Sequence, residues 1–109
     1  MAGKSPTQRS LEYLREQGYL AEVVERFNSF TKQRKDLWSW CDILAIRKDE
    51  VLAVQVTSSS NVSARIKKIQ ESDTVAKVRD AGIRIEVHGW GKNSKGRYVR
   101  SEEHTSELQ

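Results

Sequence analysis

The sequence predicts one α/β domain in which a mixed sheet is flanked by helices. Two neighbouring segments, residues 37–47 and 51–57, are apolar at nearly every position, and strands of this kind are covered on both faces. A helical segment then separates the second of them from a further strand, and a strand–helix–strand connection favours a parallel pair. With 109 residues, 37% apolar and 31% charged, the chain suits a single small globular domain.

The first expected element is a helix that starts after Ser5. Ser5 can cap it, Pro6 suits the first helical position, and Gln8 completes an S-x-x-Q capping box. Gly18 is a natural stop for this helix. Residues 19–27 follow, rich in Val and aromatic side chains, and predict the first strand.

Two more strands and their connections come next. The polar and basic run 28–35 predicts a loop or hairpin turn, and residues 37–47 predict a second strand that is irregular before Asp42. Residues 51–57 predict the third strand. The run Ser58–Asn61 is rich in residues that cap helices, so a helix is expected directly after it.

The C-terminal part predicts helices, a strand and a turn. Helices are expected over 62–71 and from Asp73 to Ala81. Apolar residues then alternate with Arg84, Glu86 and His88, which predicts a half-buried strand with these three facing outward. A turn is expected over 93–97, and Tyr98 begins a last, truncated strand. The expected core order is α-β-β-β-α-β, in one domain covering residues 1–99.

The last ten residues, RSEEHTSELQ, need separate treatment. They resemble the in-frame translation of a common sequencing-library adapter, as in a gene assembled from environmental reads. We expect residues 100–109 to be a non-native tail and leave them out of the fold prediction. The alternative is a genuine acidic tail. The whole chain carries a net charge of +4, and residues 1–99 carry +6 because the tail has one Arg and three Glu.

Asp42 and Gln55 are polar residues within the two apolar strands. If Lys48 and Asp49 form a two-residue hairpin loop, Asp42 lies opposite Gln55; a loop placed two residues later puts it opposite Thr57. In both registers the three side chains share a face. A buried carboxylate without a partner is costly, and a divalent cation would neutralise it. Asp42 and the Gln55 carbonyl are suitable ligands for Mg²⁺, although Asp42 has the structural alternative of capping a loop or pairing with a cation.

This arrangement resembles the PD-(D/E)XK nuclease superfamily, and in particular its Holliday-junction-resolvase-like, VRR-NUC-like and small phage members. The resemblance covers about Ser5 to Trp90 and implies a restriction-endonuclease-like αβββαβ core. It implies that Asp42 binds the metal and that Gln55 takes the family's Glu position. Thr57 falls where the family has its catalytic lysine, which is a departure from the pattern.

The resemblance also implies further catalytic residues and a partner. The family's first-helix acid maps to Glu12 or to Gln8, and Lys67 or Lys68 could replace the missing lysine. With Arg65, these two lysines form a basic cluster suited to phosphate. The expected cofactor is Mg²⁺ or Mn²⁺ and the expected partner is DNA, including branched or single-stranded DNA.

Three functions are compatible with these observations. The first is a metal-dependent endonuclease acting on DNA, in bacterial or phage-infected cytoplasm, with a homodimer as its expected assembly. The second is a non-catalytic relative that binds nucleic acid or a protein partner. Gln55 and Thr57 favour this function, because they stand where the family has a negatively charged ligand and a positively charged lysine. The third is an interaction module with a structural Asp42. Two tryptophans, Trp38 and Trp40, either stack on unpaired bases or fill the core.

Overall fold

The structure, a computed structural model, describes residues 4–104, except for the side chains of Phe27 and of residues 101–104. Its centre is a five-stranded sheet with the order β1-β4-β5-β6-β7. These strands are Leu20–Val23, Ile43–Arg47, Glu50–Ser58, Ile83–Lys92 and Tyr98–His104. Strands β5 and β6 are parallel and the other pairs antiparallel, so the predicted mixed sheet and its parallel pair are confirmed.

Helices cover both faces of this sheet, as predicted. On one face, α1 (Pro6–Glu16) packs its Leu11 and Leu14 against alternate residues of β4 and β5. On the other, α2 (Val62–Gln70) and α3 (Val75–Asp80) cover Ala53 of β5 and the apolar residues of β6. The two cores therefore use opposite sides of the same strands, which explains why β4 and β5 are apolar at nearly every position.

The ends of α1 agree with the sequence signals. Ser5 caps the helix by accepting a hydrogen bond from the Gln8 backbone N–H at 3.1 Å. The capping box predicted for Gln8 is wrong, because the Gln8 side chain donates to Glu12 at 3.0 Å, in the direction away from the cap. Gly18 follows with a φ of +91°, a backbone conformation that glycine adopts without strain.

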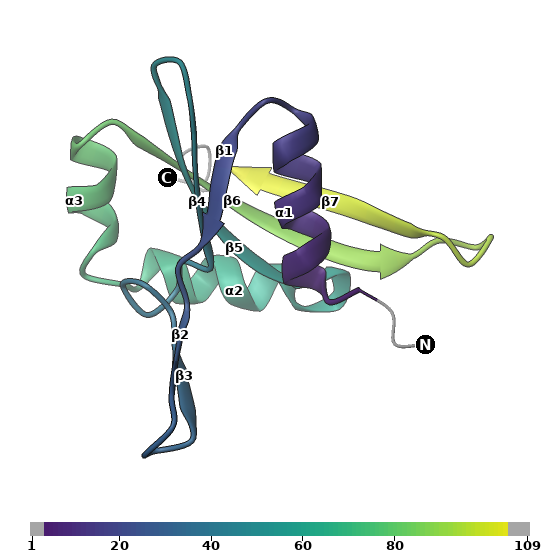
Figure 1. The fold of residues 1–109 in the computed structure, drawn as a ribbon, viewed down its shortest axis with the longest axis horizontal. Helices are drawn as coiled ribbons and strands as arrows, with labels where there is room; N and C mark the ends of the chain where they lie inside the picture. The colour runs from purple at the N-terminus through teal and green to yellow at the C-terminus, as the bar shows by residue number, and fades with distance from the viewer. Residues whose placement is uncertain (1–3, 105–109) are drawn as a thin grey trace.

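The prediction of a single first strand over residues 19–27 is wrong. Only β1 joins the main sheet; the chain then turns away and forms a separate hairpin from β2 (Arg26–Asn28) and β3 (Gln33–Lys35). This hairpin projects from the body at the lower left of Figure 1. Apart from Phe30 at its tip, the exposed residues of the hairpin are charged or polar, so this segment has little apolar surface to bury against the sheet.

The predicted second strand is also shorter than expected. It begins only at Ile43, because Leu37–Asp42 forms a tight loop in which Leu37 and Cys41 exchange backbone hydrogen bonds. Trp38 and Ser39 have φ values of +56° and +70° there. The two tryptophans of this loop differ in burial: Trp40 is buried in the core, while Trp38 is half-buried.

The alternation predicted for β6 is confirmed and Arg84 is exposed as expected, but the exposure expected for Glu86 and His88 is wrong. Glu86 and His88 face α1 instead of solvent, with exposed fractions of 5% and 0%. The reason is that α1 covers the face expected to be open. The β6–β7 ladder runs through Arg100–His104, the first half of the expected foreign tail. Strand pairing uses backbone groups that every sequence has, so this pairing does not test whether the tail is foreign, and its foreign origin stays a prediction. Residues 105–109 lie outside the described residues.

Candidate metal centre

The β4–β5 hairpin brings Asp42 and Gln55 together. Its register runs from Arg47 opposite Glu50 to Ile43 opposite Val54, which is the register of the two-residue loop. One step further, the Gln55 Nε2 donates to Asp42 Oδ2 at 2.8 Å. The backbone N–H of Val56 donates to the same oxygen at 2.7 Å. Both side chains are buried, so the expected contact between them is confirmed.

Two acids that the sequence did not single out join Asp42. Glu25 lies between β1 and β2, and Asp36 directly follows β3, so the base of the hairpin places both beside the start of β4. One carboxylate oxygen from each of Glu25, Asp36 and Asp42 lies within 4.8 Å of the others. We refer to these three residues as the acidic cluster. Three carboxylates at this separation offer the oxygen ligands that Mg²⁺ and Mn²⁺ take in proteins.

The acidic cluster is electrostatically unfavourable without a cation. Burial raises the pKa of Asp42 from its usual value near 3.8 to about 7, against the opposing effect of the hydrogen bond from Val56. The charge of Asp36, a hydrogen bond shared with it, and the charge of Glu25 raise this pKa further. Arg34 supplies a partial counter-charge at 3.7 Å from Glu25. The cluster therefore holds a proton near neutral pH, and a divalent ion would replace that proton.

Gln55 supplies a second, independent feature of this centre. Its Oε1 is buried and, within the described residues, has no hydrogen-bond partner, whereas its Nε2 contacts Asp42 and the Val56 carbonyl. A buried amide oxygen without a partner is costly. A half-turn of the amide would exchange its two ends and present Oε1 beside the Asp42 carboxylate. The residues present therefore fit a hard divalent cation bound by carboxylates and one amide oxygen.

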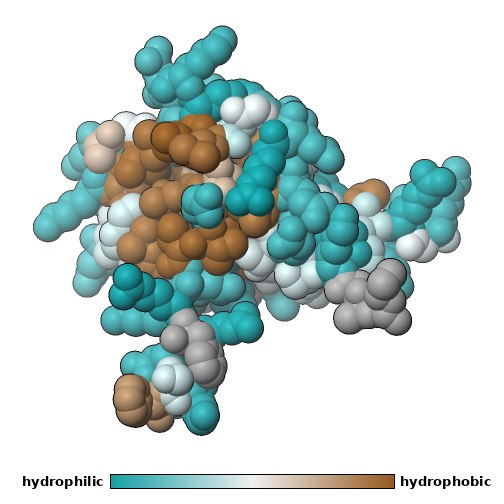
Figure 2. Space-filling model, in the orientation of Figure 1, coloured by the Kyte–Doolittle hydropathy of each residue, from teal (hydrophilic) through white to brown (hydrophobic). Residues whose placement is uncertain are grey.

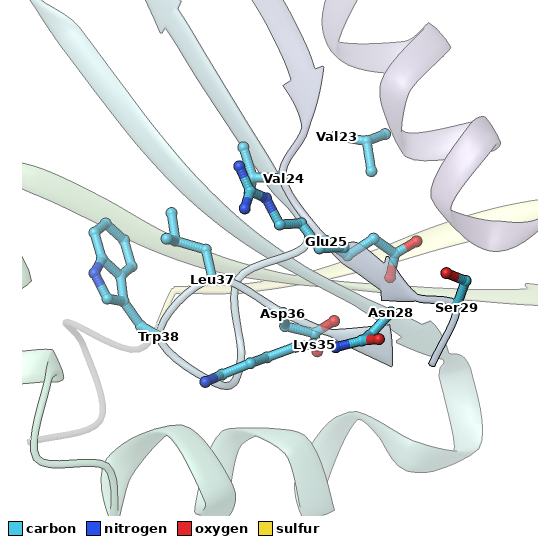
Figure 3. A pocket seen from close by; sticks show the side chains of 10 residues that line it. Val23, Val24, Glu25, Asn28, Ser29, Lys35, Asp36, Leu37 and Trp38 are labelled. Carbon is cyan, nitrogen blue, oxygen red and sulfur yellow. The ribbon is translucent and has the colours of Figure 1, made fainter. Parts of the chain in front are cut away.

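A pocket of about 910 Å³ opens next to the acidic cluster. Glu25 and Asp36 lie in its wall together with cationic, amide and apolar side chains. In Figure 3, Trp38 and Leu37 stand at one end, Glu25 and Ser29 at the other, and Asp36 between them. A ligand in this pocket would therefore lie directly beside two of the three carboxylates.

The other predicted site residues are neither part of the acidic cluster nor in the described lining of its pocket. Thr57 is buried two residues beyond Gln55 on the same face of β5. Glu12 instead bonds to Lys4 at 2.6 Å and to Gln8, on a helix that packs against the opposite face of the sheet. Glu25, and not Glu12 or Gln8, supplies the acid beside Asp42.

The basic residues of α2 are not among the described residues that line the pocket beside the acidic cluster. Val62, Ile66 and Ile69 pack toward the sheet, which leaves Lys67 and Lys68 exposed and Arg65 half-buried. The lysine that does line the pocket is Lys35, from β3. The sequence carried one signal for this arrangement: Glu25 and Asp36 bracket the basic run that forms the hairpin.

A second buried polar group lies under α1. Trp90 Nε1 donates to the Ser10 hydroxyl at 2.8 Å, and that hydroxyl lies 3.0 Å from His88 Nδ1. His88 Nε2 is 3.0 Å from Glu86, whose other oxygen accepts from Arg84. Ser10 and His88 are both completely buried. Because no substrate can reach them there, this network joins α1 to β6 and is not a catalytic triad.

Compared with known proteins, the chain matches no family model and no curated sequence. The resemblance to PD-(D/E)XK nucleases therefore stays an expectation that rests on Asp42, Gln55 and their strands. Within residues 4–104, no helix has the length and apolar character needed to cross a lipid bilayer.

Proposed function

We propose that the protein is a divalent-metal-dependent nuclease that hydrolyses phosphodiester bonds in DNA. The observation that carries this proposal is the acidic cluster, in which three carboxylates from separate segments meet within 4.8 Å beside an open pocket. The net charge of +4 supports a polyanionic substrate, since long-range attraction concentrates such a substrate at a basic protein.

Each residue of the centre has a role in this proposal. Glu25, Asp36 and Asp42 would hold Mg²⁺ or Mn²⁺, with the Gln55 amide as a further ligand. The bound ion supplies charge stabilisation at phosphorus and lowers the pKa of an attacking water. The N–H of Val56 orients Asp42 through its 2.7 Å hydrogen bond. Lys35, which lines the pocket, supplies the positive charge that Thr57 cannot.

A second function is favoured by one observation. Gln55 Nε2 and the Val56 N–H both donate to Asp42 Oδ2, so the protein satisfies this carboxylate oxygen by itself. That arrangement suits a non-catalytic relative that binds nucleic acid without cleaving it. Metal binding separates the two functions, because only the nuclease requires an ion at the acidic cluster.

The deciding experiment measures plasmid and branched-DNA cleavage by the full chain in Mg²⁺ and in Mn²⁺. The test variants are Asp36→Asn and Asp42→Asn. The matched control is Asp49→Asn, which removes the same charge from the exposed β4–β5 turn. Metal binding is followed separately by titration calorimetry with Mn²⁺.

We expect cleavage and Mn²⁺ binding by the parent chain and by Asp49→Asn, and loss of both in the two cluster variants. Cleavage that persists in Asp42→Asn would place the activity elsewhere and refute the proposal. A parent chain that neither binds Mn²⁺ at the cluster nor cleaves DNA would favour the non-catalytic relative.

A further inference from the structure

The β2–β3 hairpin carries two like charges on one face. Arg26 and Lys35 are directly opposed across its strands, as are Asn28 and Gln33. Side chains two residues apart on a strand share a face, so these four polar residues form one surface. All four are exposed. Opposed like charges destabilise a strand pair, and an anion bound between them would remove that repulsion.

This basic face lines the same pocket as the acidic cluster. Arg26, Asn28 and Lys35 stand in the pocket wall beside Glu25 and Asp36. On the opposite face of the hairpin, Arg34 pairs with Glu25 of the cluster at 3.7 Å. An anion held by Arg26 and Lys35 would therefore lie next to the candidate metal centre.

Apart from Ser29, the remaining pocket wall is apolar and includes an aromatic ring. Val23, Val24, Leu37 and Trp38 line it, and Trp38 stands at one end in Figure 3. Trp38 packs against the buried Trp40, with ring centroids 5.8 Å apart, and Trp40 is anchored by donating to Thr74 at 2.9 Å. The Trp38 backbone holds a left-handed φ of +56°, a conformation that a bulky residue rarely adopts and that is common at functional sites.

A second aromatic side chain stands at the hairpin tip. Phe30 is 96% exposed. The Asn28 side chain closes the turn that presents it by accepting hydrogen bonds from the backbone N–H groups of Phe30 and Thr31. Figure 2 shows an apolar spot at this tip, on a hairpin whose other coloured surface is mainly hydrophilic. A fully exposed phenyl ring is costly in water and gains by stacking on a flat partner.

We propose that the β2–β3 hairpin and its pocket bind an unpaired DNA strand. Arg26 and Lys35 hold its phosphates, Trp38 stacks on a base in the pocket, and Phe30 stacks on a base beyond it. Cations combined with exposed aromatic rings are the features that recognise single strands. In a duplex the bases are stacked on one another and offer no free face to Trp38. This inference rests on the proposed nuclease function and names its substrate as single-stranded.

The test measures binding separately from cleavage. Fluorescence anisotropy of a labelled 20-nucleotide oligothymidylate is followed at several salt concentrations, in EDTA and again in Ca²⁺, against a duplex of equal length. The variant Arg26→Ala/Lys35→Ala removes the two cations. Its matched control, Lys95→Ala/Arg97→Ala, removes two exposed charges from the β6–β7 turn on another side of the molecule.

We expect the single strand to bind more tightly than the duplex. Losing two phosphate contacts should reduce the slope of log affinity against log salt by about 1.4, since each contact on a single strand contributes about 0.7. The control should keep the parent slope. Phe30→Ala, which leaves the fold undisturbed because its ring is exposed, should weaken binding about fivefold or more.

Other outcomes overturn the inference. Equal slopes for the hairpin variant and its control would remove the hairpin from the binding surface. If the duplex binds more tightly than the single strand, and the hairpin variant weakens duplex binding, the hairpin contacts a groove of double-stranded DNA instead. Binding is measured in EDTA, where cleavage cannot occur, so the two proposals can fail separately. If the protein binds single strands but shows no cleavage in Mg²⁺ or Mn²⁺, the nuclease function is refuted and the binding role of the hairpin stands.

Discussion

Replacing Asp42 with Asn removes the buried charge of the acidic cluster and keeps the shape of the side chain. The amide oxygen of Asn can still accept hydrogen bonds from Val56 and Gln55, which now bond to Asp42 Oδ2. The folded protein therefore loses a charge that burial and two neighbouring acids disfavour. We expect the metal-free Asp42→Asn variant to be more stable than the parent chain at high pH.

The size and sign of this effect follow from the pKa of Asp42. Burial raises that pKa to about 7 from near 3.8, so the folded state binds the proton more tightly than the unfolded state. The free energy of unfolding of the parent chain should then fall as the pH rises from about 4 to about 7, and level off above. A tenfold difference in proton affinity between the two states corresponds to about 1.4 kcal/mol, which gives a stabilisation by Asn of up to about 4 kcal/mol at pH 8.5.

Urea denaturation in EDTA at pH 5 and pH 8.5, followed by tryptophan fluorescence, measures this effect. Adding Mn²⁺ at pH 8.5 should stabilise the parent by about 2.7 kcal/mol at a hundred times its dissociation constant, and leave Asp42→Asn unchanged. Asp49→Asn is the control for loss of an exposed charge. An Asp42→Asn variant that is no more stable than the parent at pH 8.5 would show that the charge of Asp42 does not destabilise the folded protein, and would refute this reasoning.

Three further predictions test other parts of the molecule. The double variant Gln55→Glu/Thr57→Lys introduces the ligand and the cation of the PD-(D/E)XK pattern that the sequence resembles, so calorimetry and nicking assays should show tighter Mg²⁺ binding and faster nicking. No gain in a folded protein would count against the proposed geometry. Burial raises the pKa of Cys41 to about 12, so its thiol should not react with a disulfide reagent at pH 8 until urea unfolds the chain, and rapid labelling of the native protein would contradict this. Ser10→Ala removes the hydroxyl that joins Trp90 to His88 and should cost about 1–3 kcal/mol in urea denaturation, more than the loss of the exposed helix cap in Ser5→Ala.

The local signals of the sequence predicted most of the sheet correctly. The Lys48–Asp49 loop, with alternation on both sides of it, determined the β4–β5 register and hence the contact of Asp42 with Gln55. These predictions succeed because a hairpin register depends only on the loop and on the period of two along a strand. The helix cap at Ser5 is equally local, since its hydrogen bond spans three residues.

The predictions that failed depend on contacts between distant segments. His88 was expected to face solvent because its strand alternates, but α1, nearly 80 residues earlier, covers that face. Glu25 was assigned to a continuous strand, and only the departure of the hairpin from the sheet makes it a neighbour of Asp42. Glu12 satisfied the family pattern by its place on the first helix, yet that helix packs against the other face of the sheet.

The sequence by itself therefore determined the α/β class, the paired strands and the contact of Asp42 with Gln55 in the candidate site, because propensity, alternation and loop length act over a few residues. The tertiary structure alone decided which other acids join Asp42, which lysine lines the pocket and which aromatic ring lies in its wall. Those residues reach one place through the packing of helices on both faces and the turn of the hairpin away from the sheet. Such packing depends on the whole chain at once and leaves no local signature in the sequence.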